Sequence, residues 1–531
     1  MARKGSRKVR TGCLTCKIRK IKCDEGKPVC NRCTSTGRKC DGYAVEPASV
    51  LRWQRPQTLQ IDSSTNGEEA RALQYYCEHV APFIAGPTDP YFWTHLVVQF
   101  VNREPAVKYS VIAIGLLYGN IDGGTNTHLD GVALSHYNAA IYELKSVQND
   151  NNGLVLVVCL LFVCIELLQS NKEAAVRHCN HGLAMLESSS SKPVVRDHLL
   201  PVFRRLNMLP SFPGTAFLNN AGAMVCRCPV PASFDSFAHA QATIDDLYNQ
   251  TIQLIRLGDE YRVGALRQQT PLRELLERQR NIQSSLNQWR WLWEDLDVRS
   301  KSPSTRIRGG PRVHALLKYE LSHIWTDMAF SANEAGFDQH LERFRCITEQ
   351  TTKFAESQVN CQPTHFLFEA GFTPSLFFIA TKCRALDVRL EALRLLSTLG
   401  SPREAVWDKG ELFCIARRLI ELEHNVGLDS FGVLQYTGPE SCLGLPRDEV
   451  RIRHFVPEKS TLWDSSITGG DMGGNFKVRF FMRTLEDALY VHEEVLGCEY
   501  VPDMSPFERQ HESFSSSPQS IQGWEEATIF A

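Results

Sequence analysis

Six cysteines near the amino terminus constrain this chain more than any other feature. Their spacing is C-x2-C-x6-C-x6-C-x2-C-x6-C, and the pattern divides into two matching halves. The six residues are Cys13, Cys16, Cys23, Cys30, Cys33 and Cys40. Two thiolates of a CxxC pair can bind one tetrahedral metal ion, and a third thiolate one short helix away fills most of the coordination shell.

The number of thiolates predicts two metal ions that share ligands. Three thiolates do not satisfy a four-coordinate zinc ion, and two such ions need eight ligand positions between them. Six thiolates fill eight positions only when two of them bridge both ions. The symmetry of the halves assigns the bridging positions to the first cysteine of each half, Cys13 and Cys30. We therefore expect two zinc ions as the cofactor.

A disulfide-bonded secreted domain is the alternative interpretation of these cysteines. The first ten residues are basic and no apolar segment follows them, which is not typical of a secretory signal. Thiolate ligands instead indicate a reducing compartment such as the cytosol or the nucleus. Residues 1–40 contain too few large apolar side chains to bury a core. We expect zinc to fold this segment, because structural zinc contributes roughly 10–16 kcal/mol to small domains.

Charge is distributed unevenly along the chain. Residues 1–40 contain thirteen of the 58 Lys and Arg residues but only two of the 60 Asp and Glu residues. The net charge of −2 therefore conceals a basic head and an acidic body. Basic side chains fixed between metal ligands predict a surface that binds nucleic-acid phosphates, with an affinity that falls as salt rises.

The segment from Arg10 to Cys40 resembles a known family without a gap. Its sequence, TGCLTCKIRKIKCDEGKPVCNRCTSTGRKC after Arg10, is similar to the binuclear zinc cluster of fungal transcription regulators, the Gal4-type DNA-binding domain. In that family the first and fourth cysteines bridge the two metals. The resemblance implies a nuclear, sequence-specific regulator of RNA polymerase II transcription. The implied partners are double-stranded DNA and the transcription machinery or its coactivators.

Basic side chains between the second and third cysteines are the candidate DNA contacts. The last-turn carbonyls of a short helix here can accept a hydrogen bond from cytosine, and a lysine can donate to guanine in the major groove. In the family this helix end reads a CGG-like triplet. Matched position by position, Lys20 corresponds to the base-reading lysine and Arg19 to its neighbour. Lys17 and Lys22 are better placed for phosphates.

Composition predicts four consecutive parts. Residues 1–45 form the DNA-binding module, and residues 46–68 are a linker rich in Pro, Ser, Asn and Gly. Residues 69–500 form a helical regulatory domain, and residues 501–531 form a flexible tail. The linker shows no heptads, and its prolines would interrupt a coiled coil, so a homodimer would form through the helical domain. The acidic and aromatic tail is either a coactivator-binding segment or a frayed terminus.

Apolar residues recur at spacings of three and four through the third part, as is typical of helices. The segments expected to be helical are Glu69–Val80, Tyr91–Val101, Ala106–Tyr118, Leu129–Leu144, Leu154–Leu168, Lys172–Leu186, Pro271–Trp293, Arg312–Ser331, Asp338–Ser357, Leu386–Leu396, Lys409–Leu422 and Val478–Val495. The most apolar of them, LVLVVCLLFVCIELL, is shorter than the roughly 20 residues of a membrane span. We expect it to be a buried core helix, and we expect no membrane association.

The start of this region, EEARALQYYCEHVAP, resembles the all-helical regulatory domain that follows the cluster in many fungal regulators. The predicted fold is therefore a small amino-terminal binuclear zinc cluster module plus a large all-α regulatory domain. Relatives use this domain to sense small molecules, to dimerise or to bind partners. A receptor whose helical domain binds a small molecule and gates DNA binding thus remains the alternative function.

No sequence pattern indicates catalysis. The segment HEEVL at His492 lacks the second histidine of a zinc-protease helix, because Leu496 stands in its place. The chain contains no G-x-S-x-G, no Walker loop and no dinucleotide-binding glycine pattern after a strand. The other twelve cysteines show no metal-ligand spacing and indicate small buried apolar residues. We expect a protein that is not an enzyme, and a cytosolic enzyme with an appended metal module is the third hypothesis.

Overall fold

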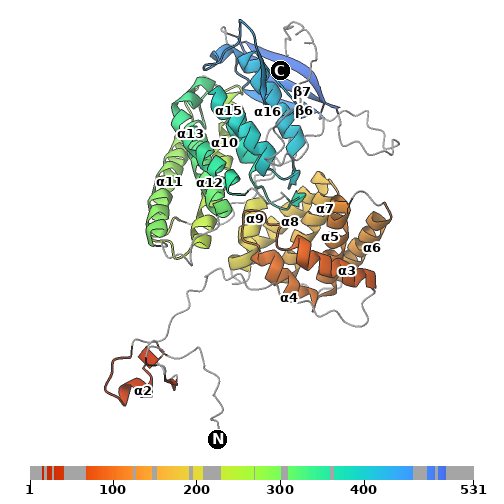
Figure 1. Ribbon diagram of the computed structural model, residues 1–531, viewed down its shortest axis with the longest axis vertical. Helices are drawn as coiled ribbons and strands as arrows, with labels where there is room; N and C mark the ends of the chain where they lie inside the picture. Colours follow the sequence, from red (N-terminus) through yellow and green to blue (C-terminus); the bar gives the residue numbers. More distant parts are fainter. Residues whose placement is uncertain are drawn as a thin grey trace. The chain divides into compact units, whose positions relative to one another are not determined.

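The computed structural model divides the chain into two compact units, Met1–Gln54 and Arg55–Ala531. It describes residues 13, 15–16, 19, 21–24, 26, 29–40, 67–123, 127–145, 152–189, 195–206, 229–267, 269–299, 309–358, 364–458, 475–484 and 488–497. A small cysteine cluster forms the first unit and a largely helical body the second (Figure 1). The predicted fold class is therefore confirmed, with the exception of one helix described below.

The first third of the body is a helical bundle. Its helices are α3 (Gly67–Tyr75), α4 (Val97–Val101), α5 (Pro105–Gly123), α6 (Thr127–Lys145), α7 (Asn152–Leu168), α8 (Lys172–Ser189) and α9 (Leu200–Leu206). Helix α7 is buried along nearly its whole length and packs against α5 and α8, which confirms it as a core helix. Its one acidic residue, Glu166, accepts hydrogen bonds from Tyr137 Oη and Asn171 Nδ2, both at 2.8 Å. The carboxylate is therefore satisfied inside the bundle.

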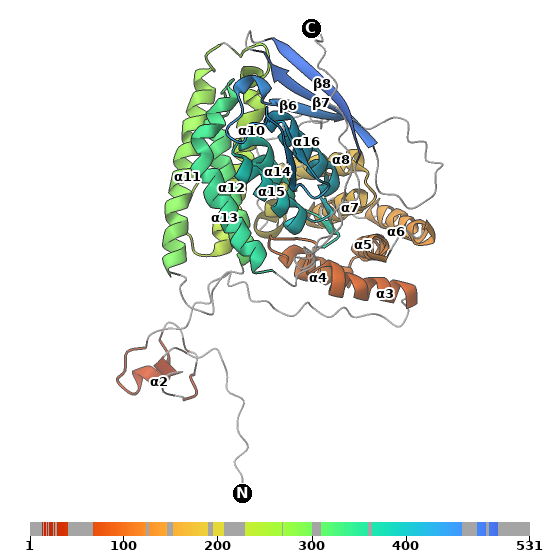
Figure 2. The same ribbon diagram turned by 45° about the horizontal axis from the view of Figure 1, so that its top comes forward.

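The second third contains the helices α10 (Phe237–Arg262), α11 (Arg273–Arg299), α12 (Gly309–Asp327) and α13 (Leu341–Glu356). Figure 2 shows them side by side, with α11 at the outer edge of the layer. Helix α10 was not among the predicted helices. Its Ser236 cap accepts a hydrogen bond from the His239 backbone N–H at 3.2 Å, and its buried face carries several polar residues. These polar residues hide the apolar periodicity by which helices are recognised.

A buried ionic cluster joins the first and second thirds. Arg205 of α9 donates two hydrogen bonds to Glu369, at 2.5 and 3.0 Å. Asp245 of α10 lies 3.6 Å from Arg205 and 2.5 Å from the Lys318 ammonium of α12. Burial opposes the charge of Arg205, but the two carboxylates hold its pKa above the usual value. Each charge is thus paired with an opposite one, as a buried charge requires.

The last third combines three helices with short strands. Helices α14 (Thr373–Lys382), α15 (Leu386–Leu399) and α16 (Lys409–His424) pack on one another. The strands β1 (Phe366–Leu367), β2 (Arg403–Glu404) and β3 (Trp407–Asp408) form one small sheet, in which β1 and β2 are parallel and β2 and β3 antiparallel. A second sheet pairs β4 (Val426–Leu428) with β5 (Leu434–Thr437).

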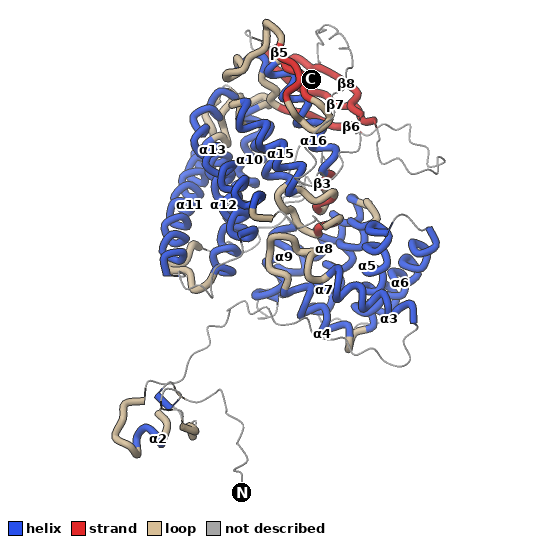
Figure 3. The backbone as a smooth tube through the Cα atoms, in the orientation of Figure 1, coloured by secondary structure: helices blue, strands red, loops and turns tan. Residues whose placement is uncertain are grey.

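The carboxyl-terminal part of the body contains an antiparallel sheet with the order β6-β7-β8 (Figure 3). Its strands are β6 (His454–Glu458), β7 (Asn475–Arg483) and β8 (Leu489–Gly497). The predicted helix Val478–Val495 is therefore wrong. Val478, Phe480 and Met482 are buried at every second position, whereas the residues between them are half-exposed, which is strand rather than helix periodicity.

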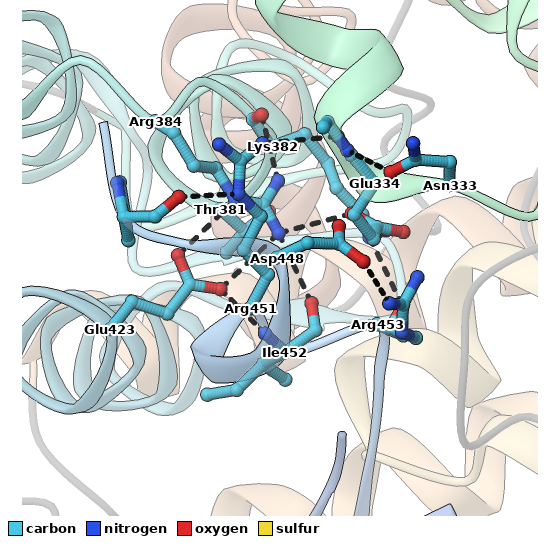
Figure 4. A network of polar contacts seen from close by, with 12 residues as sticks. Asn333, Glu334, Thr381, Lys382, Arg384, Glu423, Asp448, Arg451, Ile452 and Arg453 are labelled. Carbon is cyan, nitrogen blue, oxygen red and sulfur yellow. Dashed lines mark hydrogen bonds and ion pairs between the residues drawn. The ribbon is translucent and has the colours of Figure 1, made fainter. Parts of the chain in front are cut away.

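A second buried ionic network connects this sheet to the helices (Figure 4). The Glu423 carboxylate of α16 accepts hydrogen bonds from Arg389 Nη1 at 2.7 Å and from the Ile452 backbone N–H at 2.7 Å. Arg384 also contacts it, with Nε 3.2 Å from Oε2. Ile452 lies two residues before the start of β6, so Glu423 holds the approach to that strand against the helices. The side chains of Arg384, Arg389 and Glu423 are fully buried.

Candidate zinc centre and nucleic-acid interface

The six sulfur atoms form two overlapping groups of four. One group contains Cys13, Cys16, Cys23 and Cys30, and the other contains Cys13, Cys30, Cys33 and Cys40. Within each group all Sγ atoms lie within 4.8 Å of one another. The two groups share the first and fourth cysteines, the same residues that the ligand count selects as bridges. All six are free cysteines.

The sulfur spacing fits tetrahedral zinc. A zinc–sulfur bond of about 2.3 Å places the sulfurs of a regular tetrahedron about 3.8 Å apart. Cys13 Sγ lies 3.6 Å from Cys30 Sγ, and Cys16 Sγ lies 3.7 Å from Cys30 Sγ. A disulfide would require about 2.05 Å. The six cysteines would hold two zinc ions in this arrangement, and the zinc would supply the charge that stabilises their thiolates.

Burial of the thiols explains why a metal is needed. Cys13, Cys16, Cys30 and Cys33 are fully buried, and Cys23 and Cys40 are half-buried. Burial raises the pKa of Cys13 to about 12 and also raises the pKa of Cys16 and Cys30. Without a dication the cluster would consist of neutral thiols with weak mutual interactions. Bound metal reverses this preference, since coordinating thiols are deprotonated.

Local hydrogen bonds position the ligands of the two halves. The Cys16 backbone N–H donates to Cys13 Sγ at 3.3 Å, which closes the CxxC loop. The Asp24 carboxylate accepts from the backbone N–H groups of Asn31 and Arg32 at 2.9 and 3.0 Å. These are the first two residues of the short helix α2 (Asn31–Thr34). Asp24, which follows Cys23, therefore pairs with the free backbone N–H groups at the start of the helix that carries Cys33.

Two further side chains cross between the halves. Thr15 Oγ1 donates to the Lys39 carbonyl at 3.3 Å, and Arg19 Nη1 donates to Thr36 Oγ1 at 3.2 Å. Sequence reasoning did not single out Thr15, Asp24 or Thr36, because a lone threonine or aspartate in a loop carries no distinctive signal. Hydrogen bonds from side chains therefore supplement the shared cysteines in joining the two halves.

Two of the four candidate DNA contacts, Arg19 and Lys22, are among the described residues. Lys17 and Lys20 lie outside the described residues. Lys22 is exposed, whereas Arg19 is half-buried and its guanidinium contacts Thr36. The Lys22 side chain is therefore open to solvent, whereas the Arg19 guanidinium is engaged within the module.

Two other segments that contain histidine form no comparable site. Cys179 is buried, and the neighbouring His178 contacts Tyr137 Oη at 3.4 Å, so this segment is packed rather than metal-ligating. His492 lies on strand β8 next to Glu494, which excludes the helical geometry of a zinc protease for HEEVL. Within the described part of the chain, the two cysteine groups are the sets of potential metal ligands whose ligand atoms all lie within 4.8 Å of one another.

None of the described helices combines the length and apolar character needed to cross a membrane.

Known proteins similar to this chain contain the same cysteine module. Residues 11–48 match the family described as the fungal Zn(2)-Cys(6) binuclear cluster domain. The transcriptional regulatory protein moc3 of Schizosaccharomyces pombe is 62% identical over 44 residues, which cover 8% of this chain and 9% of that protein. No solved structure matches the chain significantly.

Longer similarities extend into the helical body. The aspercryptin biosynthesis cluster-specific transcription regulator atnN of Emericella nidulans is 27% identical over 329 residues, 53% of each chain. The transcription regulator lscL of Purpureocillium lilacinum is 24% identical over 235 residues, 38% of this chain and 55% of that protein. The chain thus spans about half the length of these two relatives. Sulfur geometry, the domain match and the relatives agree that residues 11–48 form a binuclear zinc cluster domain of the kind found in fungal transcription regulators, with two zinc ions as its cofactor.

Proposed function

We propose that this protein is a nuclear, sequence-specific DNA-binding regulator of RNA polymerase II transcription. One observation carries the proposal: two four-sulfur groups that share Cys13 and Cys30, in a segment whose remaining charge is strongly basic. All six cysteines are assigned as zinc ligands, and the two shared residues bridge the ions. Relatives named as transcription regulators support the functional class. The proposal contains no catalytic step.

Base reading is assigned to the segment between the second and third cysteines. Lys20 would donate to guanine in a CGG-like triplet, and Lys17 and Lys22 would contact phosphates. Arg19 would border the DNA, since its guanidinium is held by Thr36 at the junction of the two halves. Exposure of Lys22 supports its role, because a phosphate contact requires an unobstructed ammonium.

Substitution of single lysines tests this assignment. Lys20→Ala should cost about 1–3 kcal/mol on a CGG-containing site and relax the base preference there. Lys22→Ala should weaken binding to all sequences similarly and reduce the salt dependence. Equilibrium binding of the full chain to specific and scrambled duplexes, over a range of salt concentrations, measures both. If Lys20→Ala lowered specific and non-specific binding equally, Lys20 would be a phosphate contact and the assignment would be wrong.

Selectivity requires more than one cluster. A three-base-pair site recurs far too often for a regulator that faces roughly 10⁶–10⁹ competing genomic sites. We propose that residues 1–45 read DNA, that residues 46–68 link them to the body, and that residues 69–500 add selectivity through homodimerisation or a partner protein. Residues 501–531, which lie outside the described residues, would contact coactivators. Footprinting by the full chain and by a fragment ending at residue 68 would show whether the body sharpens selectivity.

A further inference from the structure

We propose that the outer face of α11 is the surface through which two copies of this chain pair, with the two helices antiparallel about a two-fold axis. This inference rests on the proposed homodimer and names its interface. Helix α11 packs against α10 and α12. It lies at the outer edge of the helical layer in both ribbon views (Figures 1 and 2).

The outer face of α11 carries a regular row of exposed side chains, which we call the α11 stripe. Its members alternate at spacings of four and three, so they share one side of the helix. They are Arg273, Glu277, Arg280, Ser284, Asn287, Trp291, Glu294 and Val298, all of them exposed. The opposite side is buried and contains Ile282, Leu286, Trp289 and Trp293.

Two members of the stripe are unusual for a solvated surface. Trp291 is 65% exposed and Val298 is 59% exposed. Tryptophan is normally highly buried, as Trp289 and Trp293 on the same helix are. Arg280 is also exposed, and within the described residues it makes no hydrogen bond or ion pair. An unmatched indole and an unmatched guanidinium therefore lie three turns apart on one face.

A two-fold axis between Ser284 and Asn287 would match these groups with one another. It places Arg280 opposite Trp291 of the partner subunit, and the reciprocal pair forms at the other end. Arg over a tryptophan face is a favourable cation–π arrangement. Ser284 and Asn287, which are small, then lie at the crossing point and permit close approach of the helices.

The charges of α11 favour the antiparallel orientation. Residues 273–280 contain three basic and two acidic side chains, whereas residues 290–299 contain two basic and three acidic ones. Antiparallel pairing sets each basic end beside an acidic end and also opposes the helix dipoles. Parallel pairing would instead place each charge beside its own copy. The same axis also places Glu277 opposite Glu294 of the partner subunit, where Arg273 and Arg280 flank that pair, so the net charges of the two facing ends remain opposite in this orientation.

The expected dimer is weak in the absence of DNA. A helix of 27 residues is about 40 Å long, and a single helix pair with a partly polar face belongs to the smaller interfaces, below about 1,200 Å². Two clusters bound to one duplex would raise the effective concentration of the second body and strengthen the pairing. Such a dimer would form in the free chain only at high protein concentration and would predominate on paired half-sites.

Sedimentation velocity of the full zinc-loaded chain tests the interface. The wild-type chain should show a concentration-dependent dimer, and Trp291→Ala or Arg280→Glu should raise its dissociation constant about tenfold or more. The double variant Arg280→Glu with Glu294→Arg should recover dimerisation, because it exchanges charges that lie one turn apart across the interface. Tyr142→Ala, which alters an exposed aromatic residue on α6, is the matched control and should have no effect.

A cysteine pair tests the orientation. A mixture of one chain carrying Ser284→Cys and another carrying Asn287→Cys should form the mixed disulfide between these positions, identified by peptide mass spectrometry. Preferential self-linking of each variant would indicate parallel helices and overturn the inference.

The outcomes separate this inference from the proposed function. A wild-type chain that stays monomeric, both free and on paired half-sites, would remove the homodimer and leave DNA recognition by the cluster intact. The β4–β5 hairpin, where Tyr436 is 64% and Val433 49% exposed, is the rival surface. A dimer that survives both α11 substitutions but dissociates with Tyr436→Glu would overturn the α11 assignment alone.

Discussion

In the described part of the amino-terminal module the buried core consists of four cysteines, whereas the helical body buries one apolar core that runs from Ala72 to Leu496. The described apolar side chains Ile21 and Val29 remain outside this core, at 39% and 44% exposure. The module therefore depends on metal and on a reducing environment, while the body depends on exclusion of water and on buried ion pairs. Conditions that unfold one unit should leave the other intact, and the following predictions test that separation.

Loss of zinc should produce the largest effect. Cys13→Ala or Cys30→Ala should release both ions, because each residue belongs to both sulfur groups. The module would then lose the roughly 10–16 kcal/mol that structural zinc supplies and unfold, while the body keeps its helical signal. Native mass spectrometry and circular dichroism of the full chain measure the two responses. Cys346→Ala, an exposed cysteine of the body, is the control. One tightly held zinc in either variant would contradict bridging.

Removal of a buried carboxylate should have the next largest effect. Glu423→Ala would leave Arg384 and Arg389 buried without their shared partner, at a cost of about 3–5 kcal/mol. Urea denaturation of the body should show this loss, and the zinc content should stay unchanged. Glu440→Ala, at an exposed loop position, should change the free energy of unfolding by less than about 0.5 kcal/mol. An equal effect of both substitutions would show that the network is not essential to the body.

Acidification should destabilise the body by a smaller amount. Burial, assisted by Lys318, lowers the pKa of His314 to about 3, whereas an unfolded histidine titrates near 6.5. The unfolded chain then binds more protons, so this contribution to stability is full above about pH 6.5 and falls as pH decreases toward 3. The slope is about 1.4 kcal/mol per pH unit for one histidine.

Thermal melting of the body between pH 6.5 and 5 measures this contribution. His314→Gln should flatten the pH dependence, whereas His181→Gln, at an exposed position, should not. A wild-type slope that persists in His314→Gln would assign the pH dependence to other groups.

The sequence predicted most of the helices but missed α9, α10 and α14. Segments such as Leu154–Leu168 and Leu386–Leu396 carry enough apolar periodicity to be identified directly, and α7 and α15 contain them. Helix α10 was not predicted because charged residues such as Asp245 occupy its buried side. Their ionic partners lie on α9 and α12. No local pattern reveals such pairing, since the partner lies up to 73 residues away.

The wrong helix at Val478–Val495 has a different cause. A short run of apolar residues fits the periodicity of a helix as well as that of a strand. The turn between β7 and β8 contains no glycine or proline that would mark the end of a strand. The zinc centre, in contrast, could be predicted from the sequence. Its ligands lie close together along the chain, and few other structures require six cysteines at this spacing. The hydrogen bonds of Asp24 and Arg19 required coordinates, since they depend on how the two halves fold together.

The contact between Arg205 and Glu369 has a consequence for how the chain is made. These residues are 164 positions apart, and ribosomes add about 5–20 residues per second, so Glu369 emerges roughly 8–33 s after Arg205. During that interval Arg205 has Asp245 but not its closest carboxylate, and a buried guanidinium with incomplete pairing is costly. We therefore expect the first bundle to complete its packing only after Glu369 has left the ribosome. Its carboxyl-terminal helix must wait, open to water, for a segment that is translated much later.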